Sequence, residues 1–160
     1  MHILIAAVGR MKAGAERDLC DRYLDRSRRA GRHLGFSGPD IIEIDEGRQR
    51  DTIQRKSDEA ARLLKQIPTG CKLVALDEGG KDWTSRQLTQ QMERWRDEAV
   101  PAATFVIGGA DGHGPQVLER ADVKLSFGGL TWPHMLVRIM LAEQIYRACT
   151  LLSGHPYHRD

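Results

Sequence analysis

Residues 104–109 read TFVIGG, a short apolar run that ends in two glycines. An almost uninterrupted apolar run of this length is typical of a strand that is buried on both faces of a parallel sheet. Four further runs of the same character recur along the chain: Ile3–Val8, Asp40–Asp45, Lys72–Asp77 and Asp122–Phe127. We therefore predict five strands of one mostly parallel sheet.

Helical patterns separate these runs. Apolar residues recur at helical spacing between about Ala13 and Leu34, and again between Ile53 and Leu64. Thr84 and Gln87 have the spacing of a capping box that opens a third helix, and Gly114-Pro115 is a plausible N-cap and first position of a fourth. Strands that alternate with helices predict an α/β fold with a doubly wound sheet.

The composition fits a single domain over residues 1–160. The chain is 41% hydrophobic and 29% charged, so it can bury a core. Its net charge of +2 is too small to indicate a nucleic-acid-binding protein by itself. The N-terminal apolar run lacks the basic leader of a secretory signal, and three widely spaced cysteines are expected to be free thiols. We therefore expect a cytoplasmic protein that does not enter a membrane.

A last helix, from about His134 to Leu152, is apolar nearly all the way round. Such a helix is either enclosed within its own domain or shared with a partner subunit. We favour a homodimer interface, because the last element of a small domain has few internal neighbours left to cover it. Glu143 and Arg147 have the i, i+4 spacing of an ion pair on this helix.

Double glycines follow the last three strand runs, as Gly79-Gly80, Gly108-Gly109 and Gly128-Gly129. Ligands of open α/β sheets bind beyond the carboxyl ends of the strands, where glycine allows close approach to the main chain. The alternative is that these glycines only form tight turns. Residues 108–114 lack a lysine or arginine, and the phosphate-binding and nucleophile-elbow motifs do not occur. This favours a cofactor of the adenosine type without phosphates.

The histidines do not predict a metal site. His155 and His158 are three residues apart, but no cysteine or carboxylate cluster joins them. We therefore expect no bound metal.

Four segments carry a resemblance to a known family. They read ALDEGGKDWTS (75–85), FVIGGADG (105–112), LSFGGLTWPHMLVRIMLAEQIYRA (125–148) and HPYHR (155–159). Together they closely resemble the RlmH family of the SPOUT methyltransferase superfamily. The resemblance implies a homodimer that uses S-adenosylmethionine to methylate N3 of a pseudouridine in 23S ribosomal RNA, with the assembled ribosome as partner.

The resemblance also implies a trefoil knot in the C-terminal part, although chains are almost always unknotted. The loops of the knot form the cofactor pocket in this family. The family often has a leucine at the position of Trp132, so the shape of the pocket is expected to differ there. Carried over to this chain, the implied cofactor-binding residues are Leu76, Gly108, Phe127, Gly128, Gly129, Leu130, Thr131 and Trp132.

The C-terminal segment is unusually rich in functional groups. His155 is a candidate general base, because imidazole titrates near neutrality, and Tyr157 and Arg138 are the other candidate catalytic residues. His158 and Arg159 are candidate substrate-binding residues. The resemblance implies that this tail folds over the pocket of the dimer partner. The alternative is a frayed terminus without a function.

Two other function classes stay open at this level. The first is a non-catalytic ribosome- or RNA-binding module on the same fold, and the second is a flavodoxin-like nucleotide binder. Candidate phosphate contacts of an RNA-binding surface are Arg10, Lys12, Arg48 and Arg50, which surface solvation explains equally well.

Overall fold

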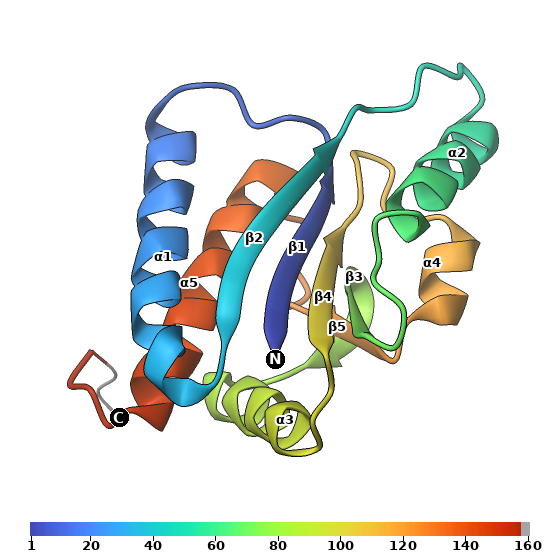
Figure 1. The fold of residues 1–160 in the computed structure, drawn as a ribbon. Coiled ribbons are helices and arrows are strands. Elements are labelled where there is room, and N and C mark those ends of the chain that lie inside the picture. The colour runs from blue at the N-terminus through green and yellow to red at the C-terminus, as the bar shows by residue number, and fades with distance from the viewer. Residues whose placement is uncertain (158–160) are drawn as a thin grey trace.

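Five parallel strands form one sheet at the centre of the computed structural model, which describes residues 1–157 (Figure 1). Their order in the sheet is β2-β1-β4-β3-β5, and every pairing is parallel. The prediction of a parallel α/β sheet is confirmed. The strands are β1 (His2–Val8), β2 (Ser37–Ile44), β3 (Lys72–Asp82), β4 (Ala102–Ile107) and β5 (Val123–Ser126).

Helices cover both faces of this sheet. In Figure 1, α1 and α5 lie side by side on one face, and α2 and α4 lie on the other. Each face has its own apolar core, and the larger core lies under α1, α3 and α5. The doubly wound arrangement is thus confirmed. The helices are α1 (Ala15–Gly31), α2 (Thr52–Leu64), α3 (Ser85–Asp97), α4 (Pro115–Arg120) and α5 (His134–Leu152), and a 3₁₀ turn, Arg32–Leu34, follows α1.

Local signals in the sequence fix several helix ends. The hydroxyl of Thr84 accepts a hydrogen bond from the main-chain N–H of Gln87, and the Gln87 side chain accepts one from the N–H of Thr84, so the predicted capping box is present. Pro115 occupies the first turn of α4 directly after Gly114. No helix among residues 1–157 combines the length and the hydropathy that crossing a bilayer requires.

The strand order departs from the plain flavodoxin-like sheet that hydrophobic periodicity alone suggests. In that sheet the third strand lies next to the first. Here β4 lies next to β1, and β3 lies between β4 and β5. The knot that the resemblance implies stays a prediction, because strand order does not record which segment passes through which loop.

The first of the three double glycines, Gly79-Gly80, does not lie in a loop, so this prediction is wrong. Strand β3 continues through Gly79 and Gly80, and Lys81 pairs with Leu125 of β5 after a shift of register. A Cβ atom on Gly80 would lie 2.7 Å from main-chain atoms of Leu125 and Lys124. Gly80 therefore permits the close approach of two strands and does not cradle a ligand.

A histidine stands out in the otherwise apolar interior near the ends of β3 and β4. His113 is 4% exposed, and neither of its ring nitrogens has a hydrogen-bond partner among the described residues. Burial lowers the pKa of His113, and the charge of Lys56 acts in the same direction. The charge of Asp77 and nearby main-chain groups of Leu76 and Val106 oppose this shift. The imidazole is therefore neutral in the folded protein at neutral pH.

Replacing Gly80 by alanine tests the contact between β3 and β5. We expect Gly80→Ala to lower the free energy of unfolding by about 1–3 kcal/mol, because the added methyl group overlaps the main chain of β5. Gly129→Ala is the matched control, because a Cβ atom there meets nothing within 4 Å. Urea denaturation of both variants measures the difference. Equal free energies of unfolding for the two variants would show that β5 can shift to accommodate the methyl group without loss of stability.

Replacing His113 by leucine tests the buried neutral imidazole. A histidine whose folded pKa is lowered takes up its proton more readily in the unfolded chain, so the free energy of unfolding falls as the pH drops below about 6.5. The slope approaches about 1.4 kcal/mol per pH unit for one proton. We expect this part of the pH dependence to be absent in His113→Leu and retained in His33→Gln, which alters an exposed histidine. Denaturation curves between pH 5 and 8 measure it, and an unchanged slope in His113→Leu would contradict the assignment.

Candidate functional site

A cavity of about 360 Å³ opens at the carboxyl ends of β3, β4 and β5. Its walls come from residues 76–78 of β3, from residues 107–113 after β4, and from a segment between Leu125 and Val137. This volume is within the range of small-ligand pockets. Seven of the predicted cofactor-binding residues line the cavity, whereas Gly129 does not: Leu76, Gly108, Phe127, Gly128, Leu130, Thr131 and Trp132.

The glycines of the loop after β4 are required by its backbone. A Cβ atom on Gly108 would lie 2.8 Å from the main chain of Gly112. Gly112 has a φ of 78°, and its N–H donates a hydrogen bond to the carbonyl of Gly109. The tight turn is therefore confirmed for this loop, and the same loop forms a wall of the cavity.

The segment after β5 forms an apolar wall of the cavity. Gly128 has a φ of 100°, and the Ser126 hydroxyl accepts a hydrogen bond from its N–H. The indole N–H of Trp132 donates to the carbonyl of Phe127 over 3.3 Å. Leu130 is 69% exposed and Trp132 is 39% exposed. The wall therefore presents large apolar side chains that this chain does not cover by itself.

The cavity also contains charged side chains that the sequence analysis did not single out. Asp77, Glu78 and Asp111 bring three carboxylates to its lining, and Lys56 brings one ammonium group. The Arg55 guanidinium donates to Asp111 over 2.7 Å and so holds the loop after β4 against α2. In the sequence, only the position of these three acidic residues beside the double glycines could have indicated that they line the cavity.

A second cavity, of about 570 Å³, lies between α1, α3 and α5. Its lining is mainly apolar, with Glu143 and Gln144 of α5 among the polar side chains. Leu125–Gly128 lines this cavity as well as the first. The end of β5 and the two residues after it therefore form a partition between the two cavities.

Tyr157 lies against the C-terminal half of α5 in its own chain. Its hydroxyl donates to Glu143 over 3.1 Å, and its ring centroid lies 4.8 Å from that of Tyr146. Arg147 bonds to Glu143 and stacks over the Tyr157 ring, so the predicted pair of Glu143 and Arg147 is confirmed. Burial raises the pKa of Tyr157, and the adjacent Glu143 adds to this shift. The phenol is therefore protonated at neutral pH.

The first cavity lies at the start of α5, whereas the tail packs on the middle and the C-terminal half of this helix. His134 and Val137 at the start of the helix line the cavity, whereas Tyr157 packs beyond its middle. The 19 residues of α5 span about 28 Å. In Figure 1 the C-terminal end of α5 lies at the bottom of the view, whereas β1 and β2 point to the upper edge of the sheet. His155 is exposed and lines neither cavity, and the predicted His158 and Arg159 lie outside the described residues.

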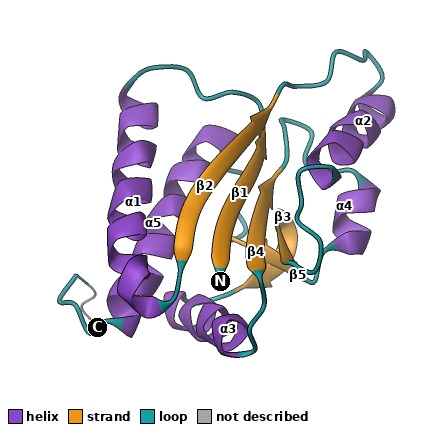
Figure 2. Cartoon of the chain, viewed as in Figure 1, coloured by secondary structure: helices purple, strands orange, loops and turns teal. Residues whose placement is uncertain are grey.

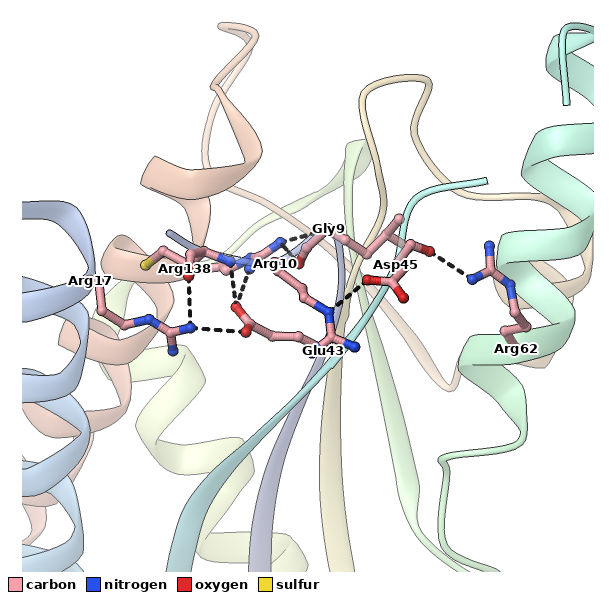
Figure 3. Close-up of polar contacts among 9 residues, drawn as sticks. Gly9, Arg10, Arg17, Glu43, Asp45, Arg62 and Arg138 are labelled. Atoms are coloured by element: carbon pink, nitrogen blue, oxygen red, sulfur yellow. Dashed lines mark hydrogen bonds and ion pairs between the residues drawn. The ribbon is translucent and has the colours of Figure 1, made fainter. Parts of the chain in front are cut away.

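Arg138 does not line either cavity. Its side chain is fully buried and donates to Glu43 over 2.7 Å and to the carbonyl of Gly9 over 2.8 Å (Figure 3). Burial lowers the pKa of Arg138, and the Glu43 charge opposes this shift. The structure thus places this candidate catalytic residue in a buried ion pair.

The candidate phosphate contacts lie on loops at the carboxyl edge of the sheet, which gather at its upper end in Figure 2. Arg10 is paired with Asp45 over 2.6 Å. Lys12, Arg48 and Arg50 are exposed, and no hydrogen bond or ion pair is seen for them within residues 1–157. Three basic side chains are therefore available to a partner.

The three cysteines do not form disulfides or a metal site within residues 1–157. Cys20, Cys71 and Cys149 are free and buried, as predicted, and burial raises the pKa of Cys20 and of Cys149 to about 11. Within residues 1–157, no three histidine, cysteine or acidic side chains gather in a way that could hold a metal ion.

Proteins of similar sequence identify the family to which this chain belongs. The model of a family described as "Predicted SPOUT methyltransferase" matches residues 1–158. Proteins named "Ribosomal RNA large subunit methyltransferase H" from Rhodopseudomonas palustris and from a Bradyrhizobium species are each 53% identical to this chain over 159 residues, which are 99% of either chain. One of the same name from Mesorhizobium japonicum is 50% identical over the same share. The chain therefore belongs to the SPOUT methyltransferase family.

Proposed function

We propose that this chain transfers a methyl group from S-adenosylmethionine to N3 of a pseudouridine in 23S ribosomal RNA. The observation that carries the proposal is the cavity at the ends of β3, β4 and β5, lined by main chain and glycine in a chain of this family. The names of its relatives support the large ribosomal subunit as the substrate. The target nucleobase, pseudouridine, and the methylated atom, N3, come from the resemblance of the sequence to the RlmH family.

The lining of the cavity suits this methyl donor. S-adenosylmethionine carries a sulfonium and an ammonium group but no phosphate. Asp77 and Glu78 offer negative charge to these cations, whereas Asp111 is already paired with Arg55. The glycine turns at Gly108 and Gly128 expose main-chain groups to an uncharged adenine. The residues present therefore fit the donor, with Trp132 shaping the apolar side of its site.

The donor supplies an activated methyl group on its sulfonium, so the protein must position the acceptor and manage one proton. The new N3–methyl bond forms as the sulfur–methyl bond breaks, and the N3 proton must leave. His155 is the proposed base for that proton, because its side chain is exposed and histidine is the most frequent general base of enzymes. Tyr157, His158 and Arg159 are proposed to bind the base and its phosphates.

The site is proposed to be composite, with the tail supplied by a second copy of the chain. Tyr157 packs on Glu143 and Tyr146 of its own chain and lines neither cavity, which supports a tail that acts on the cavity of a second copy. The uncovered side chains Leu130 and Trp132 and the mainly apolar second cavity support such an interface. The whole chain then acts as one methyltransferase domain in the cytoplasm, without a metal ion or a membrane.

Lys12, Arg48 and Arg50 are proposed to contact RNA phosphates around the site. They are exposed and unpaired in the described part of the chain, and their loops lie at the same edge of the sheet as the cavity. The net charge of +2 is small for an RNA-binding enzyme. An enzyme that recognises an assembled ribosome needs fewer such contacts, because shape recognition over a large surface replaces them.

Methylation of ribosomes tests the proposed function directly. Ribosomes from cells that lack the protein are incubated with the purified protein and S-adenosylmethionine, and 23S rRNA fragments are analysed by mass spectrometry. We expect one added methyl group on one pseudouridine, and calorimetry should show one S-adenosylhomocysteine bound per cavity. Binding of the cofactor product without any RNA methylation would contradict the substrate, and absence of binding would contradict the enzyme class.

Replacing His155 tests the proposed base and the composite site together. We expect His155→Ala to lower kcat by about 10²–10⁴-fold while the dissociation constant for S-adenosylhomocysteine changes little, because the base acts on the RNA. Gly108→Val should abolish cofactor binding, since its side chain would meet the main chain of Gly112. Mixing the two variants should restore activity through heterodimers with one intact site. A parental rate of methylation by His155→Ala at every pH would contradict the role of His155 as the general base.

A further inference from the structure

Arg138 lies in the second turn of α5, where it joins three elements of the fold. Its guanidinium donates to the Glu43 carboxylate of β2 and to the carbonyls of Val8 and Gly9 at the end of β1. Figure 3 shows the side chains of Arg138 and Arg17 pointing toward Glu43 from two different helices. The start of α5 is therefore tied to the carboxyl edge of the sheet.

Glu43 is the centre of this cluster. Besides Arg138, its carboxylate accepts hydrogen bonds from the main-chain N–H of Met11 over 2.8 Å and from Arg17 over 3.0 Å. The Arg138 side chain is fully buried, whereas that of Arg17 is 28% exposed. Removal of Arg138 thus leaves a mostly buried carboxylate and two strand-end carbonyls without their main partner.

Few polar contacts anchor the wall of the first cavity between β5 and Arg138, whereas Phe127, Met135 and Val137 pack against the larger apolar core. Among the described residues no side chain caps the first turn of α5, and Cβ atoms on Gly128 and Gly129 would meet nothing within 4 Å. The contact of Trp132 with Phe127 lies within the wall itself. His134 and Val137, which line the cavity, directly precede Arg138. Arg138 is therefore the polar anchor at the α5 end of the wall, added to these apolar contacts.

We propose that Arg138 is a positioning residue, which sets the cofactor-facing wall between Phe127 and Val137 through its ion pair with Glu43. It does not touch the reacting groups, in contrast to the catalytic role that the sequence suggested. The inference rests on the proposed function for the identity of the ligand. The ion pair and the wall are features of the chain alone, so part of the test needs no ligand.

The test compares Arg138→Met with a control that loses stability elsewhere. Leu63→Ala removes a buried side chain of α2 in the core on the other face of the sheet, at a cost of about 2–5 kcal/mol. Both variants are compared at a temperature at which both are folded. We expect Arg138→Met to raise the dissociation constant for S-adenosylhomocysteine and the KM for S-adenosylmethionine about tenfold or more, because small displacements of a binding wall are costly. We expect kcat to stay within about threefold, and Leu63→Ala to bind normally.

Hydrogen exchange of residues 127–137 gives a readout that needs no ligand. Their amides should exchange faster in Arg138→Met and at the parental rate in Leu63→Ala. Glu43→Gln, which keeps an acceptor but removes the charge, should show an intermediate effect and serves in place of Arg138→Met if that variant does not fold. Arg138→Lys should recover part of the affinity, and Arg17→Met should have parental affinity, because the pair of Arg138 and Glu43 remains.

The outcomes separate the inference from the function on which it rests. Parental affinity and parental exchange in folded Arg138→Met would overturn the positioning role, as would a lost kcat with unchanged affinity. Failure of the parental protein to bind S-adenosylhomocysteine would contradict the proposed function, whereas the exchange experiment would still decide whether Arg138 holds the wall.

Discussion

A buried arginine must keep its charge compensated wherever the chain places it, and this constraint organises the carboxyl edge of the sheet. Arg138 has no exposed surface, so its guanidinium needs the Glu43 carboxylate and the carbonyls at the end of β1. These hydrogen bonds fix the position of α5 relative to the ends of β1 and β2. The loop that joins β5 to α5 must then span the remaining gap, and that loop is a wall of the first cavity. The ion pair thus acts on the shape of the cavity from a distance.

Local physical signals made much of the fold predictable from sequence. The capping box at Thr84 and the proline at the start of α4 were readable because each depends on its near neighbours alone. The bounds of α5 were readable for the same reason, since an apolar stretch of that length between Pro133 and Gly154 has few other solutions. The strand order was not readable, because pairing of β4 with β1 is a non-local choice that hydrophobic periodicity does not encode.

The candidate site likewise contains residues that local sequence signals indicate and residues whose role only the folded structure reveals. The glycines at 108 and 128 indicated a cavity because their backbone conformations are local. Gly80 has the same residue type, yet it serves the packing of β3 on β5, and only the neighbouring strand shows this. The role of Arg138 was also hidden, because its partner Glu43 lies 95 positions earlier in the chain. His113 followed from no pattern, since its meaning lies in its burial.

The two cavities share one wall, the segment Leu125–Gly128. Leu125–Gly128 lines both, so a displacement of this segment that enlarges one cavity reduces the other. A partner subunit that filled the second cavity would press on the same residues that a ligand meets in the first. In the proposed homodimer, subunit association and ligand binding would therefore act on a single segment, which is held at one end by the pairing of β5 with β3 and at the other by Arg138. Two sites that bias one structural element are thermodynamically coupled, and the coupling is reciprocal.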